Sequence, residues 1–551
     1  MNRFLTSIIA LAFCLSAGAQ NTPQIIPQPE TYIAGHGTFD ITGITVKIDP
    51  AAGEKTAAMV NDFVEDLSNA SGVKSKVKTG AKFVKRLDKG SAHGMCFVED
   101  RYLAPEAYDI EITHKFVVVR ASDYNGFLYA VQTLRQMLPE AIYTAKPASG
   151  KRFALPCCRI KDAPRFAYRG MHMDCCRHFF STGEVRKYLE VMSMYKLNRF
   201  HWHLSDDQGW RIEIEKYPKL TEVGAYREGT QVAYDTKSSD GVRYGGYYTK
   251  EEIRGIIRFA DSLGITIVPE IDLPGHMLAA LAAYPEYGCA GSAPYKVWTR
   301  WGISKQVLCV GKEETMTFLE DILSEVAELF PGEYVHIGGD ECPKDEWKTD
   351  PDCQARIREL GLVSDDRATA EQRLQNYVTA RMQKFLAGKG KKIIGWDEVL
   401  EGELAEGATV MSWRGVKGGV AAAKAGYDVI MTPNTYCYFD YAQSENLDAE
   451  PLGITRNPKR ALTLEKVYGY EPYEDLDPAA QKHILGVQAN LWTEYIASPE
   501  HLEYMLLPRM LALSEVQWCP QGKKDFARFE TSLKDKQFKI LDLLGYKYRK
   551  Q

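Results

Sequence analysis

The sequence predicts an α/β chain in which a small α+β domain precedes a (β/α)8 TIM barrel. Two observations carry this prediction. After about residue 160, short apolar segments alternate with helical segments, and eight such apolar segments can be counted. Before that point, the order of strands and helices is mixed. The 551 residues are enough for two domains that each bury a core.

The first 19 residues have the pattern of a signal peptide. After a short positive start, residues 4–15 form an apolar run too short to span a bilayer, and Ala17-Gly18-Ala19 offers a small-residue cleavage site. We expect an exported chain that begins near Gln20 and is periplasmic or secreted. The alternative is an outer-membrane lipoprotein acylated on Cys14. No later segment is apolar enough to form a transmembrane helix.

Charge and cysteine content narrow the class of protein further. The net charge of −5 and the pI near 6.2 give no electrostatic support for a nucleic acid or an anionic membrane as partner. One of the 12 cysteines lies in the signal, and the others are too sparse for a disulfide scaffold. We expect most of them to be buried thiols.

Residues 20–160 are predicted to form the α+β domain. Residues 56–68 have helical spacing, and residues 108–112 and 116–120 are predicted to be two strands of a hairpin. Residues 126–137 are predicted to form an amphipathic helix. The acids of this domain are scattered, so we expect no catalytic residue in it.

Residues 161–551 are predicted to form the barrel. Two capping boxes, Ser181 with Glu184 and Thr249 with Glu252, mark helix starts within the repeat. The predicted strands are apolar runs bounded by turn signals, at residues 168–176, 199–205, 265–271, 334–339, 392–396, 410–413, 428–432 and 484–492. The alternative, an open doubly wound sheet, would normally place a glycine-rich phosphate loop after the first strand, and no such loop follows here.

Polar and aromatic residues gather at the predicted carboxyl ends of the strands, where barrel active sites lie. The fourth strand ends in two glycines followed by Asp340 and Glu341. Taken alone, this pair fits a solvated turn, because adjacent carboxylates repel each other. However, acids follow seven of the eight strands, and tryptophan follows three. Carboxylates and arginine bind hydroxyls, and indoles can wall a sugar ring, so the ring of residues indicates a pocket for one carbohydrate unit.

This ring comprises Asp174, Arg177, Asp206, Asp207, Glu270, Asp272, His276, Asp340, Glu341, Trp396, Asp397, Glu398, Trp413, Arg414, Tyr438, Asp440, Trp492 and Glu494. Two insertions, residues 224–248 and 434–483, are predicted to form loops at its rim.

A metal site is the main alternative chemistry. The first two strands carry a group of candidate ligands, His172, Cys175, Cys176, His178, His201 and His203. His201 and His203 face the same side of one strand, and zinc uses such ligands. Their spacing matches no common zinc motif. We therefore expect buried, hydrogen-bonded histidines, with no metal and no cofactor.

Several long motifs closely resemble those of family 20 glycoside hydrolases, the β-N-acetylhexosaminidases. Residues 336–341, His-Ile-Gly-Gly-Asp-Glu, are similar to the signature of that family. Further similar blocks at residues 169–174, 177–179, 201–211, 269–276 and 395–398 occur in the family's order, while Cys175 and Cys176 between the first two depart from its pattern. The first 160 residues resemble the small domain that often precedes the family's barrel.

The resemblance implies that residues 161–551 form a catalytic domain and that catalysis is substrate-assisted, with the substrate's 2-acetamido group as nucleophile. Glu341 would be the general acid and then the general base. Asp340 would hold the acetamido N–H and stabilise the oxazolinium intermediate, and Tyr438 would orient the acetamido oxygen.

The resemblance also implies roles around the catalytic pair. Trp396, Trp413 and Trp492 would wall the pocket. Arg177, Asp440 and Glu494 would bind ring hydroxyls, although Arg177 could instead form a barrel salt bridge. Asp206 and His276 would stand behind Glu341 and tune its pKa, the alternative being structural support alone.

The implied activity is that of a retaining exo-β-N-acetylhexosaminidase acting on a glycan with a terminal, non-reducing GlcNAc or GalNAc. Two alternatives stay open. One is a lacto-N-biosidase-like relative that releases a disaccharide. The other is a carbohydrate-binding lipoprotein that keeps the fold without catalysis, against which the intact Asp340-Glu341 pair argues.

Overall fold

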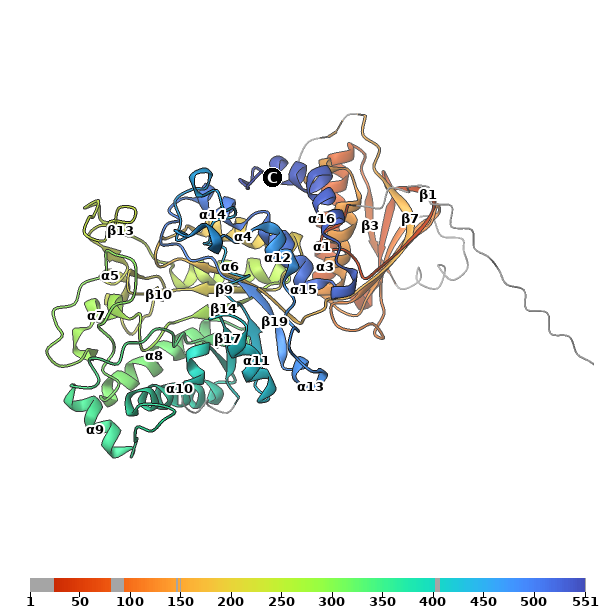
Figure 1. Ribbon diagram of the computed structural model, residues 1–551. Coiled ribbons are helices and arrows are strands. Elements are labelled where there is room, and N and C mark those ends of the chain that lie inside the picture. The colour runs from red at the N-terminus through yellow and green to blue at the C-terminus, as the bar shows by residue number, and fades with distance from the viewer. Residues whose placement is uncertain (1–23, 81–93, 145–146, 149, 402–406, 551) are drawn as a thin grey trace, which may run out of the picture.

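The computed structural model describes residues 24–80, 94–144, 147–148, 150–401 and 407–550. It contains a seven-stranded sheet and a closed barrel of eight parallel strands, two units that lie side by side in Figure 1. The predicted (β/α)8 barrel with a small α+β domain before it is confirmed. The predicted signal peptide, Cys14 included, lies outside the described residues. Among the described helices, none is long and apolar enough to cross a bilayer.

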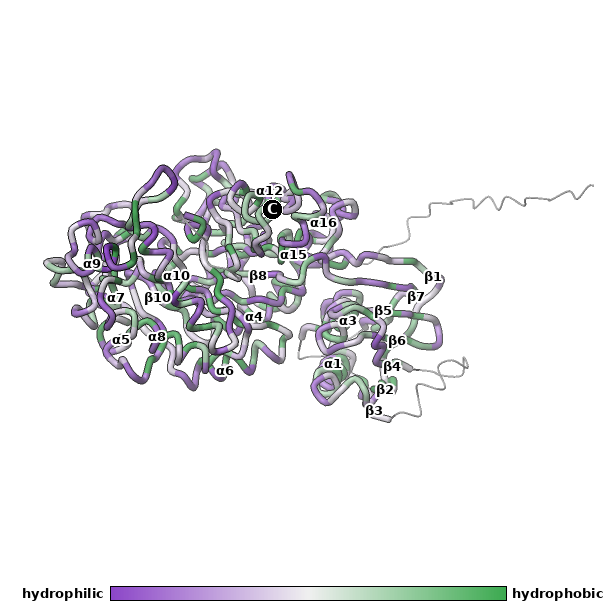
Figure 2. The backbone as a smooth tube through the Cα atoms, turned by 90° about the horizontal axis from the view of Figure 1, so that it is seen from below, coloured by the Kyte–Doolittle hydropathy of each residue, from purple (hydrophilic) through white to green (hydrophobic). Residues whose placement is uncertain are grey.

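The amino-terminal sheet has the strand order β1-β7-β5-β6-β4-β2-β3. Its strands are β1 (Thr31–Asp40), β2 (Thr45–Ile48), β3 (Lys76–Thr79), β4 (Gly94–Glu99), β5 (Tyr108–Ile112), β6 (Phe116–Ala121) and β7 (Ala154–Asp162). The antiparallel β5–β6 pair confirms the predicted hairpin. Helices α1 (Glu54–Ser71) and α3 (Tyr124–Met137) cover the same face of the sheet (Figure 2). The apolar side chains of both helices bury a core against the strands.

The barrel closes in the order β14-β15-β16-β17-β18-β19-β8-β9. Its strands are β8 (Tyr168–Asp174), β9 (Arg199–His203), β14 (Thr266–Glu270), β15 (Tyr334–His336), β16 (Lys392–Trp396), β17 (Thr409–Ser412), β18 (Val429–Met431) and β19 (Ile484–Ala489). The helices that alternate with them include α4 (Thr182–Met194), α6 (Lys250–Ser262), α8 (Glu313–Leu329), α10 (Ala370–Gly388), α11 (Lys417–Lys424), α14 (Pro499–Leu506) and α15 (Arg509–Trp518). Both predicted capping boxes, at the starts of α4 and α6, are present.

Several strands end earlier than predicted. β15 ends at His336 rather than at residue 339, because Gly338 and Gly339 take φ values of 63° and 97°, which do not continue a strand. β19 ends at Ala489, three residues before Trp492. The residues released in this way form the loops at the carboxyl ends of the strands.

The amino-terminal domain packs against the barrel at the end where the strands begin. The Arg169 guanidinium, near the start of β8, donates to both carboxylate oxygens of Glu106 at 2.8 and 3.0 Å. Lys196, just before β9, lies 3.0 Å from Asp162 at the end of β7, with both side chains fully buried. These contacts leave the carboxyl ends of the strands facing away from the domain, toward β13 (Tyr244–Gly245) in Figure 1.

Asp162→Ala is expected to lower the free energy of unfolding by about 3–5 kcal/mol, because it leaves the Lys196 ammonium buried without a carboxylate partner. The indole of Trp518 also loses its acceptor, the Asp162 carboxylate at 2.9 Å. Urea unfolding followed by tryptophan fluorescence measures the change. The control is Glu333→Ala, which breaks an exposed pair with Lys392 and should change stability by less than about 1 kcal/mol. Equal losses in the two variants would contradict the argument.

The two predicted insertions meet at the rim. The first contains the two-stranded pair β12 (Tyr226–Arg227) and β13, and the second contains helix α12 (Leu464–Gly469). The Tyr234 hydroxyl of the first donates to the Gly453 carbonyl of the second at 2.5 Å.

Candidate active site

The turn after β15 places Asp340 and Glu341 at the mouth of the barrel. Glu341 has φ 47°, a left-handed conformation that costs a residue with a side chain of order 1–3 kcal/mol. The turn is held by Asp272, whose carboxylate accepts the Gly339 N–H at 3.1 Å, and by Gln375, which donates to the Gly339 carbonyl at 2.7 Å. A Cβ on Gly338 would lie 1.8 Å from the Asp272 carboxylate, so glycine is required there.

The two carboxylates of this turn have different surroundings. The Glu341 side chain is 35% exposed, whereas that of Asp340 is 13% exposed. Burial raises the pKa of Asp340, His276 lowers it, and the negative charge of Glu341 raises it again. Asp340 Oδ1 is buried without a hydrogen-bond partner among the described residues. Asp340 can therefore accept a hydrogen bond from a ligand, while Glu341 can exchange a proton with one.

His276 lies behind both carboxylates. Its Nε2 is 3.7 Å from Glu341 Oε2 and 3.8 Å from Asp340 Oδ2. Its Nδ1 is 3.3 Å from the carboxylates of Asp206 and Asp207. Burial by itself would lower the pKa of His276, but these acids raise it well above its usual value. The structure thus places His276 between Asp206 on one side and Asp340 and Glu341 on the other.

Arg177 connects the same acids to the aromatic wall. Its guanidinium lies 2.9 Å from Asp206 and 3.3 Å from Asp174, and it stands over the Trp492 ring at 5.0 Å. The predicted alternative for Arg177, a barrel salt bridge, is therefore present. The ring contact with Trp492 places Arg177 at the pocket as well.

Asp440 and Glu494 lie close together on the neighbouring loops. Burial raises the pKa of Asp440 well above its usual range, and the charge of Glu494 raises it further. Burial also raises the pKa of Glu494, which the positive charge of Arg177 lowers in part. Asp440 Oδ1 is buried without a protein partner among the described residues. Such acceptors suit ligand hydroxyls, which donate hydrogen bonds without adding charge.

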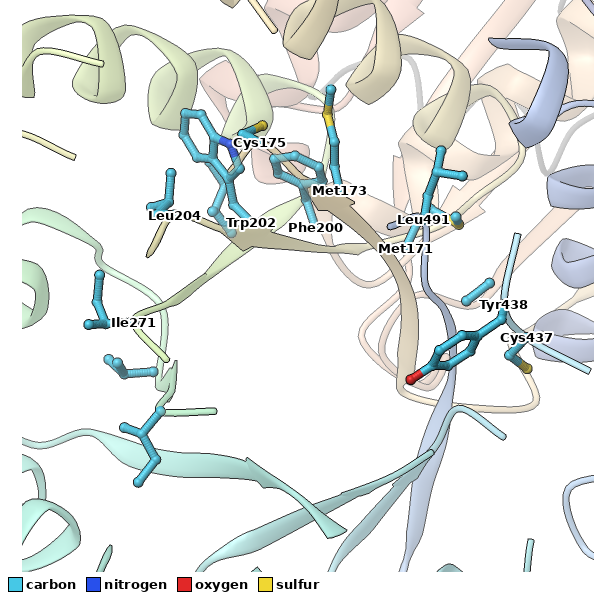
Figure 3. Packing of buried hydrophobic residues seen from close by; sticks show 14 of the residues in the cluster. Met171, Met173, Cys175, Phe200, Trp202, Leu204, Ile271, Cys437, Tyr438 and Leu491 are labelled. Carbon is cyan, nitrogen blue, oxygen red and sulfur yellow. Dashed lines mark hydrogen bonds between the residues drawn. The ribbon is translucent and has the colours of Figure 1, made fainter. Parts of the chain in front are cut away.

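Four aromatic rings lie after the carboxyl ends of the strands in two pairs. Trp396 and Trp492 have ring centroids 5.8 Å apart, and Trp413 stacks on Tyr438 at 6.1 Å. The indole N–H of Trp396 donates to Glu270 at 2.8 Å. Figure 3 shows Tyr438 with its hydroxyl directed toward the interior of the barrel. The rings therefore form an apolar wall beside the acids.

Two acids of the predicted ring, Glu270 and Asp397, bind other protein groups rather than face the pocket. Glu270 is fully buried and lies within 3.1 Å of His201, His203 and His336. Asp397 accepts the backbone N–H groups of Trp413 and Arg414 and pairs with the Arg414 guanidinium. Each holds in place an element that carries a pocket residue.

The histidines of the first two strands are buried and hydrogen-bonded, as predicted. His172, His201 and His203 are fully buried. Trp202, which lies between His201 and His203 on β9, points toward the helices in Figure 3. Because side chains alternate along a strand, these two histidines face the opposite way, toward the interior of the barrel. Cys175 also faces the helices, where its sulfur accepts the Trp202 indole N–H at 3.2 Å. The Cys175 side chain therefore points away from His201 and His203, although these residues were considered together as possible metal ligands.

Glu398, a member of the predicted ring to which the family motifs assign no role, lies close to Asp340 and Trp413. Burial, together with the charge of Asp340, raises the pKa of Glu398 to about 8. Its carboxylate accepts the Trp413 indole N–H at 2.9 Å. The only sequence signal was its place at the end of β16, next to Trp396 and Asp397.

Comparison with known families agrees with this geometry. Residues 166–521 match the family described as glycosyl hydrolase family 20, catalytic domain, and residues 22–163 match glycosyl hydrolase family 20, domain 2. A beta-hexosaminidase from Porphyromonas gingivalis is 44% identical over 448 residues, 81% of this chain and 55% of that protein. One from Vibrio furnissii is 37% identical over 415 residues, 74% of this chain and 64% of that protein. The match thus spans less than two thirds of each of these two relatives.

A solved structure gives the same result. The crystal structure of a family 20 exo-β-N-acetylglucosaminidase from Vibrio harveyi, in complex with N-acetylglucosamine, is 32% identical with a TM-score of 0.81. The likeness covers 96% of this chain and 78% of that chain. On its fold, its motifs and these matches, the chain belongs to glycoside hydrolase family 20.

Proposed function

We propose that this chain is a retaining exo-β-N-acetylhexosaminidase that removes terminal GlcNAc or GalNAc through an oxazolinium intermediate. The observation that carries the proposal is the turn at Asp340 and Glu341, where one carboxylate is exposed and the other is only 13% exposed, beside an aromatic wall. The names of the relatives support the reaction, and the Vibrio harveyi complex supports N-acetylglucosamine as the sugar. We further propose that residues 1–19 direct export to the periplasm or the medium.

The position of the two carboxylates favours a nucleophile supplied by the substrate. A retaining glycosidase with its own nucleophile places an acid and a nucleophile on opposite sides of the scissile bond. Here both carboxylates lie within 3.8 Å of the same nitrogen, His276 Nε2, and so on one side of the pocket. The acetamido carbonyl oxygen can attack from the opposite face.

In the first step, the acetamido oxygen forms a bond to C1 as the bond to the leaving oxygen breaks. Glu341 donates its proton to that oxygen. Asp340 accepts the acetamido N–H and stabilises the positive charge of the oxazolinium ion. In the second step, Glu341 takes a proton from a water molecule, and the water oxygen attacks C1. The bond between C1 and the acetamido oxygen breaks, which opens the oxazolinium ring. Two inversions give net retention.

The remaining residues would bind the sugar. Trp396, Trp413 and Trp492 would wall the ring and the acetamido group, and Tyr438 would orient the acetamido oxygen. The hydroxyl acceptors would be Asp440 and Glu494, with Arg177 as donor. The rim insertions that meet at Tyr234 and Gly453 would limit what extends beyond the first sugar.

A panel of aryl glycosides tests the proposal. We expect hydrolysis of the β-GlcNAc and β-GalNAc compounds and a loss of at least about 10³-fold for the β-glucoside, which lacks the nucleophile. An aryl glycoside of a disaccharide should release no disaccharide. Release of two sugars together would favour the lacto-N-biosidase-like alternative, and no turnover of any compound would favour a binding protein.

A further inference from the structure

Three cysteines and one aspartate form a buried cluster outside the catalytic site. Cys289 and Cys309 lie in the long loop after β14, and Cys353 lies in helix α9 (Pro351–Glu359), whose N-cap is Asp350. None of the four is more than 5% exposed. One ligand atom from each, three sulfurs and one oxygen, lie within 4.8 Å of one another. The mechanism above uses none of them.

The spacing within the cluster is that of ligands around one small cation. The sulfurs of Cys309 and Cys353 are 3.7 Å apart. Two thiolates bound to tetrahedral zinc at about 2.3 Å would be about 3.8 Å apart. Cys309 Sγ lies 3.2 Å from Asp350 Oδ1, close to the roughly 3.5 Å edge between a sulfur and an oxygen ligand. A disulfide would instead require a separation of about 2.05 Å and would leave the third thiol unpaired.

The backbone around the cluster also favours a bound cation. The Asp350 carboxylate is fixed by the backbone N–H groups of Ala290 at 2.8 Å and Cys353 at 2.9 Å. Such support from the backbone is what holds metal ligands in position.

We propose that Cys289, Cys309, Asp350 and Cys353 form a structural zinc site. Four protein ligands close the tetrahedron and leave no position for a substrate, which is typical of a structural rather than a catalytic site. This inference departs from the sequence prediction of no metal. It is independent of the proposed glycosidase activity.

The cluster joins two segments that both carry residues of the candidate active site. The loop after β14 carries His276, and the segment before α9 carries Asp340 and Glu341. Two further contacts join these segments, the Trp347 indole to the Leu308 carbonyl at 2.9 Å and the Val307 N–H to the Glu346 carboxylate at 3.0 Å. A bound zinc would hold these two segments in a fixed relative position. The distances from His276 to Asp340 and Glu341 depend on that position.

Metal analysis of the full chain, purified without reductant or chelator and dialysed, tests the site. We expect inductively coupled plasma mass spectrometry to find about one zinc ion per chain. Cys309→Ser and Cys353→Ser should each lower the zinc content at least about tenfold. The matched control is Cys96→Ser, which removes a buried thiol from β4 and should leave zinc unchanged. Zinc retained by both cluster variants would overturn the proposal.

A second measurement covers the case in which the serine variants do not fold. Wild-type chain stripped of zinc and titrated with Co²⁺ should show a thiolate-to-cobalt charge-transfer band that saturates at about one equivalent. Peptide mapping without reduction should find all three cysteines unlinked. The absence of both zinc and the cobalt band, or a disulfide between any two of the three, would overturn the site.

Discussion

Replacing Glu341 with glutamine is expected to lower kcat/KM by about 10²–10⁴-fold on substrates with poor leaving groups, such as a GlcNAc disaccharide. The amide cannot give a proton to the leaving oxygen, although it keeps the shape of the side chain. On an aryl glycoside whose phenolate leaves without protonation, the loss of kcat/KM should be about tenfold or less. Steady-state kinetics on both substrates measures the difference.

The leaving-group dependence separates an acid from a residue that only supports the fold. Glu359→Gln is the matched control, because Glu359 is an exposed glutamate in α9. It should leave both substrates unaffected. Equal losses on good and poor leaving groups in the Glu341 variant would contradict the assignment of Glu341 as the acid.

Asp340→Asn is expected to lower kcat by about 10²–10³-fold on good and poor leaving groups alike. Asparagine preserves the volume of the side chain and an acceptor oxygen, so binding of the acetamido N–H can persist. It removes the negative charge that faces the oxazolinium ion in a site where Asp340 is 13% exposed and the charge is weakly screened. The expected loss is therefore in kcat more than in KM.

The kinetic constants of the Asp340 variant should be compared with those of a control variant at an exposed residue of the same loop. Asp345→Asn serves, since the Asp345 side chain is 68% exposed, and it should behave as the wild type. A kcat within about fivefold of the wild type for Asp340→Asn would show that the charge is not needed, against expectation.

The periodic parts of the fold could be predicted from the sequence because they depend on local pattern. The capping boxes at Ser181 and Thr249 and the hairpin of β5 and β6 appear where they were expected. The strand ends were placed too far along the chain where special backbone conformations intervene. The left-handed glycines after His336 end β15 early, and their conformation depends on Asp272, 66 residues before Gly338.

The site was predictable to the extent that it follows strand ends and family motifs. The resemblance named Asp340 and Glu341, but it could not show that His276 lies within 3.8 Å of both. The raised pKa of Glu398 arises from burial beside Asp340. In the cysteine cluster, Cys309 contacts Asp350 and Cys353, which lie 41 and 44 residues further along the chain. Interactions of this kind are fixed by tertiary packing, which no short spacing encodes.

The central claim is that the nucleophile belongs to the substrate. Aryl β-GlcNAc substrates whose acetyl group carries zero, one, two or three fluorines test it most directly, because each fluorine weakens the carbonyl oxygen as a nucleophile. The account predicts that kcat/KM falls with each fluorine, by a total of at least about 10³-fold, a loss of about 4 kcal/mol in transition-state stabilisation. A kcat/KM that is the same across the series would contradict substrate assistance and require a nucleophile from the protein.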